Sequence, residues 1–195
     1  MTKQQFKYRS LPFYLGIGLI LALFIAGWRL TALADGGGVA AALNAGGLTV
    51  KSNFNSNTLS VALNGQDQMI SYTLPLLVTD ATGSGGGWSL TITSTQFSTS
   101  ASPPNTLSPY SLQIVGVSVS CGTNSLCTNP SNTIGFPQAV PAAMKAPQPQ
   151  KFFQAIPSTG LGTLAITPML SILIPGKTYA GMYNSIVTLA VVSGP

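Results

Sequence analysis

The sequence predicts an all-β protein, an antiparallel β-sandwich with Greek-key or barrel-like connections and one proline-rich surface loop. Short segments alternate between apolar and polar residues or are rich in β-branched residues, as half-buried strands are. Glycine-rich and Asn-Gly turns separate them, and no window has the apolar stripe and caps of a helix. Strands at this spacing, with Ser, Thr and Asn on their exposed faces, are typical of sandwiches and barrels.

The first 34 residues have the three parts of an export signal. Basic residues precede an apolar run from 11 to 28, and the small residues Ala32 and Ala34 form a cleavage site. We therefore expect residues 1–34 to be a signal peptide. The alternative is an uncleaved anchor, because the apolar run approaches the length that spans a bilayer. The rest of the chain is expected to be secreted, at the cell surface.

The domain itself is predicted to begin after a lead-in. Residues 35–47 are rich in glycine and alanine without periodicity, so we expect a flexible segment. Residues 48–195 are long enough to enclose one hydrophobic core. We predict strands at residues 48–51, 59–63, 69–78, 88–95, 113–120, 164–174 and 185–192. In 88–95 the large apolar residues occupy alternate positions, which predicts one buried face and one exposed Ser/Thr face.

Residues 137–157 interrupt the strand pattern. This segment has five prolines around an Ala-Ala-Met-Lys-Ala patch. We predict a long surface loop with one helical turn, inserted between strands.

The composition argues against most enzyme chemistry. Only 6% of the residues are charged, there is no histidine, and the only acidic residues are Asp35, Asp67 and Asp80. Paired carboxylates and histidine or glutamate metal ligands are therefore almost ruled out. A Ser-Lys dyad would need S-x-x-K, which does not occur, and the glycines at 83–87 precede a strand, unlike those of a phosphate-binding loop. We expect no enzymatic activity, no cofactor and no metal site.

The net charge of +5 is concentrated near the N-terminus. Half of the eight basic residues precede residue 35, and residues 35–195 hold four lysines against three aspartates. A body so close to neutral lacks a field that attracts phosphates, so we expect no nucleic-acid partner. Contact with a membrane is expected only through the N-terminal segment.

The two cysteines fit an exported protein. Cys121 and Cys127 are separated by five residues, a spacing that a local disulfide can close. A redox pair or a metal site is the alternative. No histidine or third cysteine is present to complete a zinc site, and the spacing is not C-x-x-C.

Part of the chain resembles a known family. The stretch 78–92 has Asp80 and a glycine-rich turn before Gly87-Trp88-Ser89-Leu90, and it resembles the first motif of the WxL domain, a secreted bacterial surface domain. Gly181-Met182-Tyr183, residues 186–189 and the terminal Pro195 are similar to the closing strand of that family. The resemblance spans 48–195. Where the family usually has a second Trp-x-Leu, this chain has Leu189-Ala190-Val191, so the match is WxL-like.

The resemblance implies an all-β fold and noncovalent attachment to the Gram-positive cell wall, with peptidoglycan as the usual ligand. The candidate ligand contacts are Trp88, Leu90 and Tyr183. For Trp88 the residues themselves allow two interpretations, core packing or a platform that stacks on a sugar. Tyr179 and Tyr183 would share one face of a regular strand, where packing is the simpler role.

Two residues are predicted to shape the turn before Trp88. Asp80 is expected to cap the turn through its side chain, with calcium binding as the alternative. Gly87 belongs to a run of three glycines that lets the backbone turn tightly.

Two functions follow as hypotheses. The first is a wall-associated module that binds peptidoglycan or another envelope polymer, with other surface proteins as further partners. The second is a structural subunit that assembles with itself into a fibre or layer by β-strand addition. In that hypothesis 39–43 and 48–50 are the donor segment, and the low net charge removes the repulsion that keeps sheet edges apart.

Overall fold

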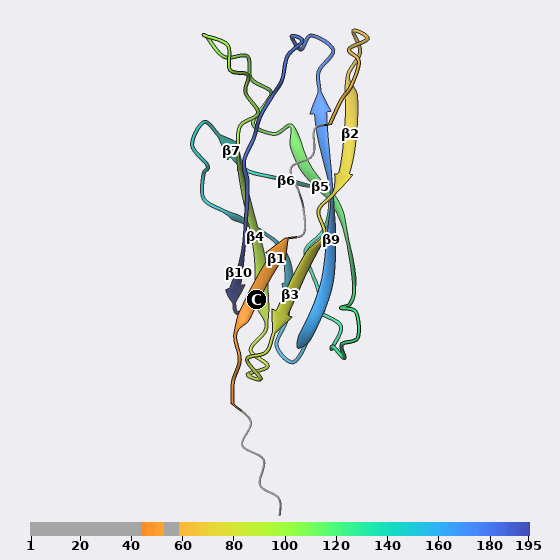
Figure 1. The fold of residues 1–195 in the computed structure, drawn as a ribbon, viewed down its shortest axis with the longest axis vertical. Coiled ribbons are helices and arrows are strands. Elements are labelled where there is room, and N and C mark those ends of the chain that lie inside the picture. The colour runs from red at the N-terminus through yellow and green to blue at the C-terminus, as the bar shows by residue number, and fades with distance from the viewer. Residues whose placement is uncertain (1–43, 53–58) are drawn as a thin grey trace, which may run out of the picture. The chain divides into compact units, whose positions relative to one another are not determined.

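The described residues form two β-sheets packed face to face. The structure is a computed structural model that describes residues 44–52 and 59–195, and Asn44–Pro195 cluster as one compact unit. In these ranges every regular element is a β-strand (Figure 1). The all-β sandwich is confirmed. The leader and the lead-in as far as residue 43 lie outside the described residues, and no helix within the described ranges could span a bilayer.

The larger sheet is built around β9 (Gly162–Ile174). Because β9 is long, it pairs with two successive strands on one side, β3 along its first half and β2 along its second. Strand β5 lies along its other side, and all these pairs are antiparallel. Strands β1 and β6 extend the sheet beyond β3 and β5. The remaining bounds are β1 Leu48–Ser52, β2 Gln68–Thr73, β3 Leu76–Asp80, β5 Leu112–Cys121 and β6 Gln138–Ala139.

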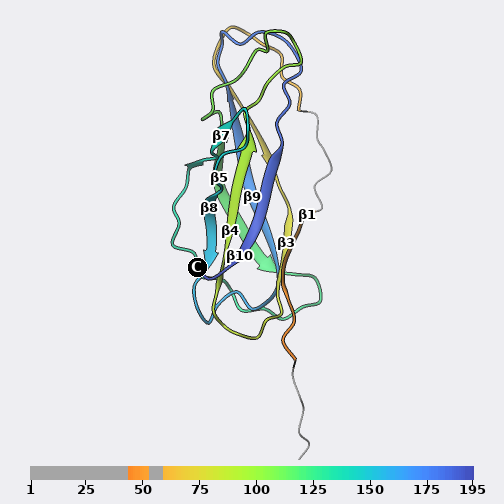
Figure 2. The same ribbon diagram turned by 90° about the vertical axis from the view of Figure 1, so that its left-hand side faces the viewer.

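The smaller sheet is built around β4 (Trp88–Thr95), whose bounds match the predicted strand. Strand β10 (Val187–Ser193) pairs antiparallel with one side of β4 in an unbroken register. The other side of β4 pairs with β7 (Ala142–Ala143) near one end and with β8 (Gln150–Ala155) along the rest. Figure 2 shows β8, β4 and β10 side by side in front of the larger sheet.

Two predicted strands differ from the structure. The segment predicted as one strand at 69–78 is two strands, interrupted at Leu74 and Pro75. Proline has no backbone N–H for a ladder, and the break lets the chain continue past the middle of β9, where Leu74 N–H donates to the Pro168 carbonyl at 2.9 Å. Residues 59–63 form no strand.

The proline-rich segment is not the loop with a helical turn that the sequence predicts. It contains β6, β7 and β8, and Val140, Phe152 and Phe153 are buried in the core. A bulge in the pairing of β8 with β4 explains why the two adjacent phenylalanines are both buried. Between the two short strands, Val140 N–H donates to Leu112 O in one sheet, and Pro141 O accepts from Ser94 N–H in the other. This segment therefore closes one side of the sandwich.

The Ser/Thr face of β4 is also covered, contrary to the prediction. Ser89 and Thr93 are buried. The Thr93 hydroxyl donates to the carbonyl of Pro147 at 2.9 Å, so the segment between β7 and β8 lies over this face. The proline-rich segment therefore covers this face of β4.

Most of the core comes from strands inside the two sheets. The fully buried side chains with the largest volumes are apolar: Trp88, Phe152, Leu90, Ile92, Leu112, Ile114, Leu164, Ile166 and Leu170. Each such side chain contributes about 1.5–3 kcal/mol through burial. The edge strands β1 and β10 add only half-buried residues that pack against this core: Leu48, Val50, Val187, Leu189 and Val191.

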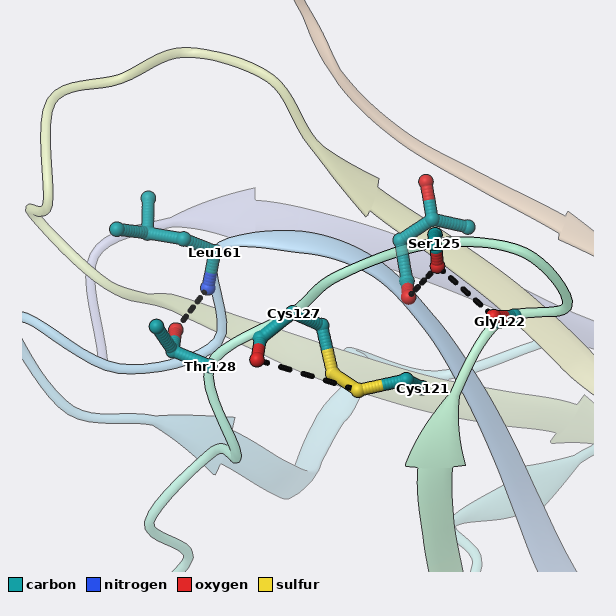
Figure 3. Close-up of a disulfide and its surroundings, with 7 residues drawn as sticks. Cys121, Gly122, Ser125, Cys127, Thr128 and Leu161 are labelled. Carbon is teal, nitrogen blue, oxygen red and sulfur yellow. Dashed lines mark hydrogen bonds between the residues drawn. A yellow bond between two sulfur atoms is a disulfide. The ribbon is translucent and has the colours of Figure 1, made fainter.

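The predicted disulfide is present between Cys121 and Cys127, whose Cα atoms are 5.6 Å apart. It closes the loop that leaves β5, and hydrogen bonds attach this loop to β9 (Figure 3). Gly122 N–H and the Ser125 hydroxyl both donate to the Thr163 carbonyl, at 2.8 and 3.1 Å. These bonds hold the loop in place, and within it the side chain of Leu126 is 97% exposed.

The half-buried Tyr72 on β2 predicts a loss of stability at high pH. Burial raises the pKa of Tyr72 to about 12 from its ordinary value of 10.0. Between these values the unfolded state has lost the proton and the folded state still holds it, so the free energy of unfolding should fall as the pH rises from 10 to 12. Urea unfolding at several pH values measures this slope. Tyr72→Phe should flatten it, whereas Tyr110→Phe, at an exposed site, should not.

Candidate functional site

The glycine-rich turn before β4 is held by a ladder of side-chain hydrogen bonds. The Asp80 carboxylate accepts from the Thr82 N–H at 3.0 Å and from its hydroxyl at 2.6 Å. The Thr82 hydroxyl is 3.0 Å from that of Ser84, which accepts from Gly86 N–H. The turn-capping role of Asp80 is confirmed. Among the described residues, no three or more acidic, histidine or cysteine side chains gather to hold a metal ion.

Gly87 ends this turn in a position where a side chain does not fit. Its φ is +76°, and a Cβ would collide with the Ala155 carbonyl oxygen at the end of β8. Its own carbonyl accepts from Gly194 N–H at 3.0 Å. The predicted structural role of Gly87 is confirmed, because the turn is enclosed between the ends of β8 and β10.

Trp88 and Leu90 are wrong as ligand contacts. Both side chains are fully buried, because β4 directs alternate residues into the core. The indole N–H of Trp88 donates to the Gly160 carbonyl at 2.9 Å, and its ring lies 6.0 Å from that of Phe153. A Cβ on Gly160 would be only 2.8 Å from this nitrogen. We call Gly87, Trp88 and Gly160 the Trp88 corner, and its role is packing.

Exposed aromatic residues lie at the other end of the sandwich. Loops 59–67, 96–111 and 175–186, which we call the tip loops, meet there (Figure 1). They are tied together, because Gly176 N–H donates to the Asp67 carboxylate at 2.8 Å and Ser98 bridges to Asn184. Here Tyr179 is 72% exposed, and Tyr110 and Met182 are exposed as well.

Tyr183 is the one predicted ligand contact that reaches this end. It is half-buried against the core, and its hydroxyl donates to the Tyr179 carbonyl at 3.0 Å. Both tyrosines lie outside the strands, so the regular strand predicted for them is wrong. Tyr183 supports the backbone that presents Tyr179.

The side of the sandwich opposite the proline-rich segment is not closed by hydrogen bonds. Strand β1 of the larger sheet contacts β10 of the smaller one, but each pairs with a single neighbour among the described strands, β3 and β4 respectively. We call β1 and β10 the open side. One hydrogen bond lies at each end of the β10–β4 ladder: Thr95 N–H donates to Ile186 O, and Gly194 N–H donates to Gly87 O. In an antiparallel ladder the residues between, such as Leu189 and Val191, direct their backbone groups away from β4.

Within the described residues, strand β10 lacks the charges, prolines and bulges that usually protect an edge. It is seven residues long, regularly paired, and has neither charge nor proline in Val-Thr-Leu-Ala-Val-Val-Ser. The free edge of β8 is different, because Gln154 N–H donates to the Asn132 side chain and Ile156 N–H to Ser131 O. An unprotected β10 is suited to pairing with another strand.

No known family, curated protein or solved structure matches this chain. The WxL resemblance therefore stays a prediction based on the motif around Trp88. Sequence reasoning did not identify β10 as an open edge or Tyr110 as exposed. The absence of charge in 187–193 was the available signal for the edge.

The Trp88 corner predicts unequal costs for two glycine substitutions in one turn. Gly83 and Gly87 both have positive φ, but a Cβ on Gly83 would meet nothing within 4 Å. We expect Gly83→Ala to cost about 1 kcal/mol for its backbone conformation and Gly87→Ala to cost about 1–3 kcal/mol more for overpacking. Chemical denaturation of both variants measures the difference. Equal costs would contradict the close packing of Gly87.

Proposed function

We propose that the chain is an exported structural protein of the cell surface, whose copies join by β-strand addition at the open side. The observation that supports this proposal is the edge of β10, which has no charge or proline and lies beside β1, on a side of the sandwich where no described strand pairs with both sheets. Strand addition supplies main-chain hydrogen bonds to such an edge. The partner is a second copy or another surface protein, and no cofactor is required.

Charge and covalent structure support a role in assembly outside the cytoplasm. Residues 35–195 are nearly neutral, so two copies repel each other little. The disulfide fits an oxidising compartment. Of the expected donor segment, residues 48–50 form part of β1 and pair with β3 of the same chain, whereas residues 39–43 lie outside the described residues.

A lysine on β10 should weaken self-association. Val192→Lys places a charge on the exposed face of the open edge, and Met169→Lys places one on the exposed face of the central strand β9, at similar exposures of 48% and 45%. Two differently tagged copies of the full chain, produced in one exporting host, should co-purify. We expect Val192→Lys in both copies to lower recovery of the second copy about tenfold, because charges on an edge oppose pairing. Met169→Lys should not lower it.

Wall association is a second candidate function, favoured by the exposed aromatics of the tip loops. Tyr110 and Tyr179 offer flat rings beside hydroxyl and amide groups, which is how proteins contact sugars. The predicted binding to peptidoglycan or another envelope polymer would then use this end of the domain, with Tyr183 as a supporting residue, in place of Trp88.

Co-sedimentation of the exported protein with isolated cell walls tests this candidate. Tyr179→Ala should reduce the pelleted fraction at least threefold, because it removes the most exposed ring of the tip loops. Leu126→Ala, which removes an exposed side chain in the disulfide loop, is the matched control and should have no effect. Added salt should change pelleting little for so neutral a body. Full binding by Tyr179→Ala would exclude Tyr179 from the site.

A further inference from the structure

Strand β1, like β2, contributes no fully buried side chain to the larger sheet. Its residues are half-buried or exposed, and none belongs to the fully buried core. Among the described strands it pairs with β3, with Leu48 opposite Asp80 and Ser52 opposite Leu76. Its removal would separate the half-buried Leu48 and Val50 from the core and would leave the pairing of β9 with β2, β3 and β5 in place.

The described residues that flank β1, 44–47 and 59–67, belong to no strand. Gly46 and Gly47 precede it, joined to the domain by hydrogen bonds with Ala81. After it, the described residues 59–67 contain no strand before β2 begins. Strand β1 is thus short, and the described residues after it, 59–67, are not paired in a strand.

From these observations we propose that copies of the chain join by exchanging β1, so that β1 of one copy pairs with β3 of the next. This inference rests on the proposed function, assembly by strand addition at the open side, and names β1 as the added strand and the edge of β3 as its acceptor. The occupant is the same segment of a second copy, so each hydrogen bond and each half-buried contact of β1 is remade in the assembly. Exchange of an identical element is a low-cost route to association.

The edge of β3 where β1 pairs, which we call the seat of β1, can accept β1 of a second copy without electrostatic conflict. On the adjoining strand β3, Leu76 and Val78 are buried, and Val50 of β1 lies opposite Val78, so loss of β1 would increase the exposure of apolar side chains at this edge. Lys51 lies opposite the apolar Leu77, and the Asp80 carboxylate is already bonded to Thr82. Beside this site, β10 contacts β1, and Leu189 and Val191 of β10 pack against the same core as Leu48 and Val50 of β1.

The exchanged register gives a direct test by cysteine cross-linking. Thr49 of β1 lies opposite Thr79 of β3, and residues paired in this way have Cα atoms about 4.5–5.5 Å apart, within the range that a disulfide bridges. Two full-length copies with different tags are produced together in an exporting host, one with Thr49→Cys and one with Thr79→Cys. The natural cysteines form the disulfide, and the described residues hold no free thiol to compete. After mild oxidation on intact cells, we expect a linked dimer that carries both tags.

In the matched control, the second cysteine is placed at Thr163, the neighbour of Thr79, and Thr79 is unchanged. Thr163 pairs with Thr79 on the next strand, β9, and their hydroxyls share a hydrogen bond of 3.2 Å, so each single substitution removes the same contact. Two strand spacings place Thr163 about 10 Å from Thr49. Thr49→Cys with Thr163→Cys should therefore give at least tenfold less linked dimer. Equal linking of both pairs would overturn the exchange.

Co-purification of the two tags separates the inference from the function on which it rests. Copies that co-purify without linking through Thr49→Cys and Thr79→Cys would show that they join elsewhere, so the exchange is wrong and the proposed function stands. Copies that neither co-purify nor link would overturn both. A single chain that carries both Thr49→Cys and Thr79→Cys tests the fold itself, because its own β1 and β3 should then be joined by a disulfide. Its failure to do so would contradict the pairing of β1 with β3.

Discussion

The arrangement of the two sheets depends on close packing around the buried indole ring of Trp88. Two crossings between the sheets, from β3 to β4 and from β8 to β9, meet at Trp88, and its N–H is satisfied by the Gly160 carbonyl in the second crossing. Glycine is required on both sides because a Cβ at position 87 or 160 would enter occupied space. Since β4 is the centre of the smaller sheet, this corner fixes the position of β10 and β8 relative to the larger sheet.

The sequence predicts this fold well where alternation and glycines act together. Strand β4 matches its predicted bounds because Trp88, Leu90 and Ile92 alternate directly after the glycine turn. The sequence does not reveal the break at Pro75, because the even positions are the less exposed ones in both strands, half-buried in β2 and buried in β3, and this alternation continues across the break. Strands β6 and β7 have two residues each and β8 contains a bulge, so none of them has a period that the sequence could reveal.

The candidate sites show a different limit. Trp88 is conspicuous in the sequence and is buried in the structure, because an aromatic residue after a tight turn serves packing as readily as recognition. Whether a strand is an edge depends on which segments lie beside it, and those segments are distant in the sequence. The open side therefore emerges only from the pairing of β1 and β10. The disulfide was predictable because the loop between its cysteines is local.

The two ends of the sandwich are unlike in a way that gives the domain a direction. Leu48 pairs with Asp80 and Ser193 with Trp88, so the chain enters β1 and leaves β10 at the same end (Figure 1). The tip loops with Tyr110 and Tyr179 lie at the far end, along the length of β9. A tether at either terminus of the sandwich would therefore hold the exposed aromatic residues of the tip loops at the end of the domain farthest from the attachment point.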